Sequence, residues 1–178
     1  MPRLFTALEI PSPLAFSLSL LRGGLPGARW VDPENYHITL RFIGDIDQRT
    51  ADEIGGALER VDRPSFDLAV SGLDAFGGNK PHSIVACVTA SAALKELQGE
   101  HERIIQRIGL EPERRKFRPH ITLARIKTAS QADAAAYLAL RGDFRTAPFP
   151  VGRFVLLSSR DSRGGGPYVM EEAYPLAA

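Results

Sequence analysis

The tetrapeptide His-Ile-Thr-Leu occurs twice, at residues 37–40 and again at residues 120–123. The chain has four histidines among its 178 residues, and this repeat contains two of them. Both copies lie in segments rich in β-branched and aromatic residues, YHITLRFI and HITLARI, which are typical of strands. Apolar residues at helical spacing follow each segment. The repeat therefore predicts one α+β half that is made twice.

Alternation along a strand sorts the four residues of the motif between two faces. In each copy the histidine and the threonine point one way, whereas the isoleucine and the leucine point the other way. We expect the apolar pair to pack under helices, and His37 with Thr39, like His120 with Thr122, to face the opposite side. Each pair spans about 6–7 Å along its strand. A phosphate group can therefore accept hydrogen bonds from both members.

Paired histidines suit phosphoester chemistry. Imidazole has a pKa near 6.5, so one neutral and one protonated copy coexist near neutral pH. On opposite sides of a phosphorus atom, the two rings supply a base for water and an acid for the leaving oxygen. A zinc site is the chemical alternative, but the HExxH and CxxC spacings are absent and Cys87 is the one cysteine. We therefore predict a site without a metal.

The remaining elements follow from periodicity and turn residues. The strand of the first motif is expected to end at Gly44-Asp45, and residues 30–35 are expected to be irregular. A loop is expected at 161–167. Further strands are expected at 3–10, 66–73, 83–88, 151–158 and 168–173, and helices at 14–21, 51–61, 92–108 and 131–140. Two such halves facing each other place the motif strands near a pseudo-twofold axis, with their polar side chains in one cleft.

Composition restricts the partners. A formal net charge of +1 argues against a protein that coats nucleic acid, but it is compatible with a site for one or two phosphates. The basic run at 114–118 is a solvated turn or an electropositive lip beside the second motif. No apolar run approaches the ~18 residues that span a bilayer, and no secretory signal is evident at the start. With Cys87 expected to be buried and inert, we expect a cytoplasmic protein without a membrane partner.

The double His-x-Thr motif resembles that of the 2H phosphoesterase superfamily, and the neighbouring residues resemble its RNA 2′,3′-cyclic phosphodiesterases, the 2′-5′ RNA ligase family. This resemblance extends over almost the whole chain. It is carried by RLFTALEIP at 3–11, YHITLRFIGD at 36–45, FGG at 76–78, FRPHITLAR at 117–125 and GPYVMEEAYPL at 166–176. It implies one domain over residues 1–178, with two interleaved lobes. The implied fold is α+β and bilobal, with two pseudo-twofold-related halves, antiparallel sheets lining a central cleft, and helices outside.

The resemblance also implies an activity and a set of site residues. The activity is hydrolysis of an RNA terminal 2′,3′-cyclic phosphate to a 2′-phosphate without a cofactor, with 2′-5′ RNA ligation as the reverse type of reaction. His37 carries over as the general acid and His120 as the general base, although these two roles can be exchanged. Thr39, Thr122 and Arg125 carry over as phosphate ligands. The expected partners are RNA 3′ ends, such as tRNA fragments, or small cyclic nucleotides, bound by a monomer.

Strand parity raises a question about the arginine. Arg125 stands five residues after His120, so a regular strand turns it to the helix face unless a bulge or the strand end redirects it. Arg41, four residues after His37, has the parity of the histidine but weaker support from the family. Two alternatives to an RNA-end enzyme stay open. One is a 2H enzyme for a small cyclic phosphate, and the other is a non-catalytic module that binds RNA ends.

Other residues are assigned structural roles. His101 is expected on a solvated helix face, and His82 in a loop. The glycine-rich run at 163–167 lacks the lysine and hydroxyl residue of a phosphate loop, so we expect a turn there. Phe5 and Tyr168 are expected to belong to the core or the cleft wall, with stacking on a terminal base as the alternative.

Overall fold

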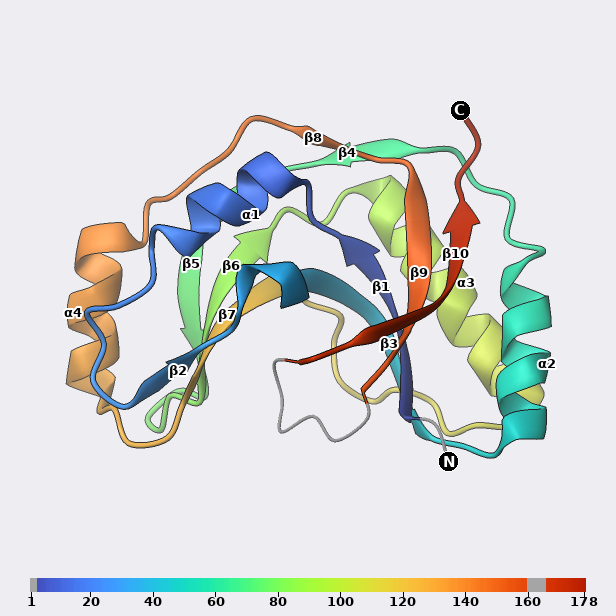
Figure 1. The fold of residues 1–178 in the computed structure, drawn as a ribbon, viewed down its shortest axis with the longest axis horizontal. Coiled ribbons are helices and arrows are strands. Elements are labelled where there is room, and N and C mark those ends of the chain that lie inside the picture. The colour runs from blue at the N-terminus through green and yellow to red at the C-terminus, as the bar shows by residue number, and fades with distance from the viewer. Residues whose placement is uncertain (1–2, 160–165) are drawn as a thin grey trace.

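The computed structural model describes residues 3–159 and 166–178 and consists of strands backed by helices (Figure 1). The strands are β1 (Arg3–Glu9), β2 (Ala28–Trp30), β3 (His37–Asp45), β4 (Phe66–Leu68), β5 (Val70–Phe76), β6 (Ser83–Val88), β7 (His120–Ile126), β8 (Phe149–Val151), β9 (Arg153–Ser158) and β10 (Val169–Pro175). The helices are α1 (Ser12–Ser19), α2 (Gln48–Leu58), α3 (Ala92–Ile108) and α4 (Gln131–Arg141), with a 3-10 turn η1 (Pro33–Asn35).

Within the described residues, eight strands form one antiparallel sheet in the order β10-β9-β1-β3-β7-β6-β5, with β2 paired to β7. The motif strands β3 and β7 are therefore neighbours at the centre of the sheet. In Figure 1 they meet in the middle, with α2 and α3 at one end of the molecule and α1 and α4 at the other. The expected α+β fold, with two similar halves, is confirmed.

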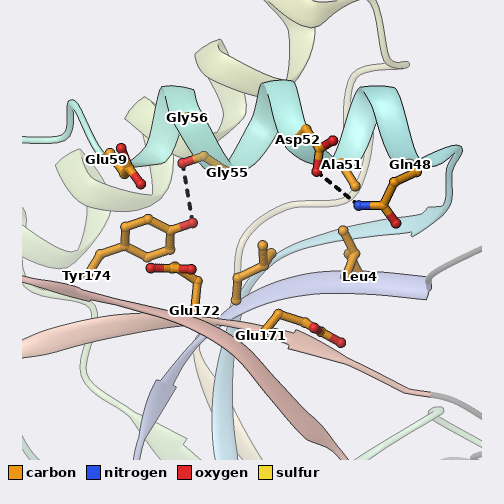
Figure 2. Close-up of a pocket in the computed structure, with 11 residues that line it drawn as sticks. Leu4, Gln48, Ala51, Asp52, Gly55, Gly56, Glu59, Glu171, Glu172 and Tyr174 are labelled. Carbon is orange, nitrogen blue, oxygen red and sulfur yellow. Dashed lines mark hydrogen bonds between the residues drawn. The ribbon is translucent and has the colours of Figure 1, made fainter.

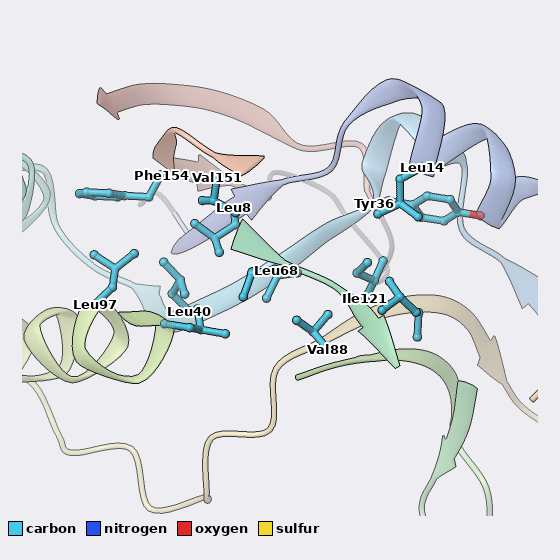
Figure 3. Packing of buried hydrophobic residues seen from close by; sticks show 14 of the residues in the cluster. Leu8, Leu14, Tyr36, Leu40, Leu68, Val88, Leu97, Ile121, Val151 and Phe154 are labelled. Carbon is cyan, nitrogen blue, oxygen red and sulfur yellow. The ribbon is translucent and has the colours of Figure 1, made fainter. Parts of the chain in front are cut away.

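The apolar side of the sheet packs against the helices to form one large core. Ile38 and Ile121, from the two motifs, are fully buried there. Figure 3 shows side chains of this cluster from β1, α3 and β9, among them Leu8, Leu97 and Phe154. The isoleucines and leucines of the motif therefore pack on the helix side, as their parity predicts.

Side-chain caps fix where three of the helices begin. Asp47 accepts from the Thr50 amide ahead of α2, and Ser91 accepts from the Leu94 amide ahead of α3. A reciprocal capping box, formed by Ser130 and Asp133, starts α4. These caps place α2, α3 and α4 within three residues of their expected starts.

Four expected element boundaries were wrong. The segments 66–73 and 151–158 each contain parts of two strands, because the chain passes at Ala69 and at Gly152 between the small β4-β8 sheet and the large one. An alternating pattern does not reveal such a change of sheet. The strand of the first motif continues through Gly44, whose φ of 92° suits glycine. Residues 28–35 contain β2 and η1 rather than an irregular segment.

The expected loop at 161–167 lies mostly outside the described residues. No helix within residues 3–159 and 166–178 is long and apolar enough to cross a membrane.

Candidate active site

The two motifs meet where β3 and β7 pair through Ile38 and Ile121. Because this pairing is antiparallel, the residues beside it are His37 across from Thr122, and Thr39 across from His120. The side chains of these four residues point away from the helices and are half-buried. We call this side of the sheet the histidine face.

Each motif histidine is held in the same way by its own main chain. Nδ1 of His37 lies 2.9 Å from the carbonyl oxygen of Asn35, and Nδ1 of His120 lies 2.6 Å from that of Arg118. A carbonyl oxygen only accepts, so Nδ1 carries the proton and donates in both rings. Nε2 is therefore the reactive nitrogen in each. Nε2 of His37 is 3.0 Å from the hydroxyl of Thr39.

Burial and positive neighbours lower the pKa of both histidines in the unliganded protein. Burial lowers the pKa of His37 to about 4, with further lowering by the charges of His120 and Arg125. Burial also lowers the pKa of His120, again assisted by Arg125 and by Arg118. A bound anion opposes this lowering and favours the protonated ring.

A bulge in β7 resolves the question of Arg125. Thr122 and Ala124 pair with consecutive residues of β6, so Leu123 is the extra residue. The bulge shifts the parity of the strand, and Arg125 becomes exposed on the histidine face. Its charge acts on both His37 and His120. The structure thus brings Arg125 together with the motif residues.

β3 has the same bulge at the equivalent leucine. Thr39 and Arg41 pair with consecutive residues of β1, so Leu40 is the extra residue. The parity shift turns Arg41 to the helix side, where its side chain is 7% exposed and pairs with Glu102 of α3. It also donates to the carbonyl oxygen of Glu111 at 2.5 Å. The expectation that Arg41 shares the face of His37 was therefore wrong.

Aromatic rings pack beside both histidines. Phe5 and Tyr168 lie with ring centroids 5.1 and 5.0 Å from that of His37, and Phe76 lies 4.8 Å from His120. The guanidinium of Arg118 lies 4.5 Å over the Phe76 ring. Phe5 and Tyr168 thus form a wall at the first motif. Sequence reasoning missed Phe76, although the FGG segment that contains it had pointed to this loop.

The basic run before β7 is exposed and only partly neutralised. Arg115 pairs with Glu113 at 3.2 Å, and Arg118 lies 3.9 Å from Asp74. Arg114 and Lys116 are exposed. The run therefore adds positive charge beside His120, consistent with a lip as well as with a solvated turn.

The structure corrects the expectation for His101 and shows where Cys87 and His82 lie. His101 is fully buried rather than solvated, with Nδ1 2.9 Å from the Thr6 hydroxyl and its ring against Phe154. Cys87 is half-buried and pairs across strands with His120, and burial raises the pKa of its thiol. His82 is exposed at the end of its loop.

Two hollows in the described part of the chain are not lined by either motif histidine. One, of about 320 Å³, lies between α2 and β10 and has Glu172, Asp52 and Tyr174 in its lining (Figure 2). The other, of about 470 Å³, lies beside α1 and η1. No group of three or more His, Cys, Asp or Glu side chains in the described part of the chain is arranged to hold a metal ion.

A bilobal α+β sheet with paired His-x-Thr strands at its centre defines a two-histidine phosphoesterase. Comparison with known families agrees, because the model of the LigT-like phosphoesterases matches twice, at residues 8–86 and 87–168. The chain belongs to this family. Each match contains one of the two His-x-Thr motifs.

Curated relatives and solved structures show the same likeness. The RNA 2′,3′-cyclic phosphodiesterase of Aeropyrum pernix is 36% identical over 153 residues, covering 84% of this chain and 86% of that protein. The Aquifex aeolicus protein of the same name is 32% identical over 155 residues, covering 82% and 81%. E. coli LigT complexed with 3′-AMP superposes with a TM-score of 0.81 at 22% identity, covering both chains fully.

Proposed function

We propose that this protein hydrolyses the terminal 2′,3′-cyclic phosphate of RNA to a 2′-phosphate. The observation that carries the proposal is the pairing of His37 and His120 on adjacent strands of one face, each with Nδ1 held by a main-chain carbonyl oxygen, so that Nε2 is the nitrogen used for proton transfer. The names of the relatives support RNA as the substrate.

The reaction needs one proton removed and one delivered. His120 Nε2 takes a proton from water as the water oxygen bonds to phosphorus. The bond from phosphorus to the 3′ oxygen breaks, and His37 Nε2–H gives its proton to that oxygen. The products are a 2′-phosphate and a 3′-hydroxyl. Each proton transfer contributes roughly 10²–10⁴ in rate.

Thr39, Thr122 and Arg125 are proposed to hold the non-bridging phosphate oxygens. The Thr39 hydroxyl, which lies beside His37 Nε2 in the unliganded protein, turns to the phosphate when substrate enters. Arg125 adds a positive charge at the same face. Charge-assisted hydrogen bonds of this kind are about twice as strong as neutral ones, so they stabilise the charge that develops on phosphorus oxygens.

The low pKa of His37 has a consequence for its role as the acid. With a pKa of about 4, the ring is neutral at pH 7 in the free protein. The negative charge of the bound phosphate favours the protonated ring, so we propose that the catalytic proton is taken up with the substrate. Uptake of about one proton is measurable by calorimetry in buffers of different ionisation enthalpy.

The test uses a short RNA that ends in a 2′,3′-cyclic phosphate, in excess EDTA, from pH 5 to 9. We expect a 2′-phosphate product from the wild type and loss of activity in both His37→Ala and His120→Ala. Binding of the cyclic-phosphate end without any turnover would instead identify a non-catalytic module. Turnover confined to mononucleotides would favour an enzyme for small cyclic phosphates.

A sulfur substitution separates the acid from the base. A thiolate can leave without being protonated, because the pKa of a thiol is near 8.5, far below that of an alcohol. With a substrate whose 3′ oxygen is replaced by sulfur, His37→Ala should recover most of its activity, whereas His120→Ala should not. If only His120→Ala recovered its activity, His120 would be the general acid and His37 the general base.

Five finer properties are part of the proposal. Residues 1–178 act as one domain, as a monomer, in the cytoplasm. The substrates include fragments such as those of tRNA, and 2′-5′ ligation is the reverse type of reaction on related ends. Sedimentation of the purified protein at several concentrations tests the monomer, because a dimer would change its apparent mass.

A further inference from the structure

Arg118 contacts His120 directly through its main chain and indirectly through Phe76. Its carbonyl oxygen accepts the hydrogen bond from Nδ1 of His120 at 2.6 Å, and its guanidinium lies 4.5 Å over the ring of Phe76. The ring of Phe76 in turn lies 4.8 Å from that of His120, at an angle of 70°. The three residues therefore form a closed set of contacts around the imidazole. We call Phe76 and Arg118 the clamp of His120.

Phe76 belongs to the histidine face, although β6 lies between its own strand, β5, and the motif strand β7. Asp74 pairs with Val85, and Val85 pairs with Thr122, so these three side chains project to the same face. Phe76 stands two residues after Asp74 and shares its parity. The residue between them, Ala75, packs against the hydrophobic core. The ring of Phe76 therefore reaches the second motif across β6.

A glycine turn fixes Phe76 at the end of β5. The amide of His82 donates to the carbonyl oxygen of Phe76 at 2.8 Å, and the amide of Lys80 donates to that of Gly77 at 3.1 Å. Gly77 has a φ of 114°, and a Cβ there would clash with the carbonyl oxygen of Lys80. The turn therefore needs glycine at this position, and it sets where the ring of Phe76 begins.

The side chain of Arg118 has a second contact on the strand of Phe76. Its guanidinium lies 3.9 Å from the carboxylate of Asp74, and both side chains are more than half exposed. Residues 110–119, which lead from α3 into β7, are neither helix nor strand. Contacts of the Arg118 side chain with β5 therefore help to fix the carbonyl oxygen that holds His120.

We propose that Phe76 and Arg118 are positioning residues for His120, which keep its Nδ1–H on the Arg118 carbonyl oxygen and direct its Nε2 to the substrate. This inference rests on the proposed function, in which Nε2 of His120 takes a proton from water. A neutral imidazole can carry its proton on either nitrogen, and its ring can turn about the Cβ–Cγ bond. The hydrogen bond selects the tautomer, and the ring of Phe76 restricts the rotation.

The kinetic test uses an RNA dinucleotide that ends in a 2′,3′-cyclic phosphate, and the same molecule with a hydrogen in place of its terminal base. Phe76→Leu and Arg118→Gln should each lower kcat about tenfold on both substrates, because a misplaced base slows the chemical step. KM should stay unchanged. Phe76→Tyr and Arg118→Lys keep a ring and a cation, so they should keep most of kcat.

Matched controls change the same residue types at exposed positions away from the motifs. Phe16→Leu on α1 and Arg60→Gln in the turn after α2 should leave kcat and KM unchanged. The double variant Phe76→Leu/Arg118→Gln should lose no more kcat than the more impaired single variant, because either change releases the same imidazole. Losses that multiply would show two independent effects and would overturn the clamp.

A second readout needs no substrate. Nitrogen-15 NMR distinguishes an imidazole with its proton on Nδ1 from one with its proton on Nε2. In alkaline buffer, His120 of the wild type, assigned by comparison with His120→Gln, should carry its proton on Nδ1. Phe76→Leu and Arg118→Gln should each show a mixture of both tautomers. The same tautomer in the wild type and in both variants would overturn the clamp.

The outcomes separate this inference from the function on which it rests. A rise in KM confined to the substrate with a terminal base would make Phe76 a contact of that base and overturn its positioning role. Wild-type kcat in both single variants would also overturn that role and leave the proposed function standing. A wild type that hydrolyses neither substrate would overturn the proposed function, and the tautomer of His120 would still decide whether the clamp exists.

Discussion

Phe42 and Arg125 occupy equivalent positions in the two halves of the sheet. Each follows its motif histidine by five residues, and each lies beyond a bulge at the last residue of the motif. Phe42 is 45% exposed, and it pairs across strands with Phe5. The repeated motif is thus flanked by an aromatic ring in one half and by a guanidinium in the other, so the surroundings of the two histidines differ in chemistry.

Phe42 is predicted to contribute to binding of the terminal base. Stacking of a base on an aromatic ring is worth about 1–3 kcal/mol. Phe42→Ala should therefore raise KM for a mononucleoside 2′,3′-cyclic phosphate by about tenfold. The matched control substrate is methyl riboside 2,3-cyclic phosphate, which has no base, and its KM should stay the same. An equal rise for both substrates would argue for a general disturbance of the site.

The pH profile of kcat/KM is predicted to peak below pH 6.5. This parameter reports the pKa values of the free enzyme, and that of His37 is lowered to about 4 while that of His120 is also lowered. The form with a single proton on the pair is therefore most populated on the acid side of 6.5. Steady-state rates on a dinucleotide substrate check this, and a maximum above pH 6.5 would contradict it.

Removal of Arg125 is predicted to lower the rate and to move the profile. Its positive charge lowers the pKa of both histidines, so Arg125→Gln should raise both values and shift the maximum of kcat/KM to higher pH. Loss of a phosphate donor should also reduce kcat by about 10²–10³-fold. Arg60→Gln, with the same change of net charge, should do neither. A lower rate without any shift would place Arg125 away from the histidines.

Arg41 is predicted to be a structural residue. Its guanidinium is buried against Glu102, so Arg41→Met leaves a carboxylate without its main partner. Breaking such a buried pair costs about 3–5 kcal/mol. Urea unfolding should show this loss in the free energy of unfolding. Arg49→Met breaks the exposed pair with Glu53 and should change that free energy by less than about 1 kcal/mol.

His101 is predicted to make the protein sensitive to acid. Burial lowers its pKa to about 3 in the folded state, whereas the unfolded chain has the ordinary value of 6.5. The unfolded state thus binds more protons below pH 6.5, and the free energy of unfolding falls as pH decreases from 6.5 toward 3. His101→Gln should flatten this slope in urea titrations.

The faces of the motif strands could be predicted from sequence, whereas the bulges could not. Alternation alone places His37 and Thr39 opposite Ile38, because the period of a strand is fixed. A bulge forms where one strand has an extra residue relative to its neighbour, and the sequence of a single strand does not show which residue is extra. Arg41 was therefore assigned to the wrong face, and the position of Arg125 was left open.

His101 shows a different reason for error. Its sequence neighbours are charged, and they suggested a solvated position. In a helix, however, the residues that share a face are three or four positions away, and for His101 these include Leu97, Ile104 and Ile105. All of these are buried. Burial of His101 was therefore indicated by the residues three and four positions away, and not by its immediate neighbours in the sequence.

The place of β1 in the sheet has a consequence for how the chain folds. β1 lies between β3 and β9, so strands of residues 3–9 and 153–158 pair although they are far apart in the sequence. Pairing between segments so distant in sequence slows folding. The repeat is evident in the sequence, but the strand order does not allow the chain to be divided into two separate halves. A fragment with one motif would expose open sheet edges, which favour aggregation.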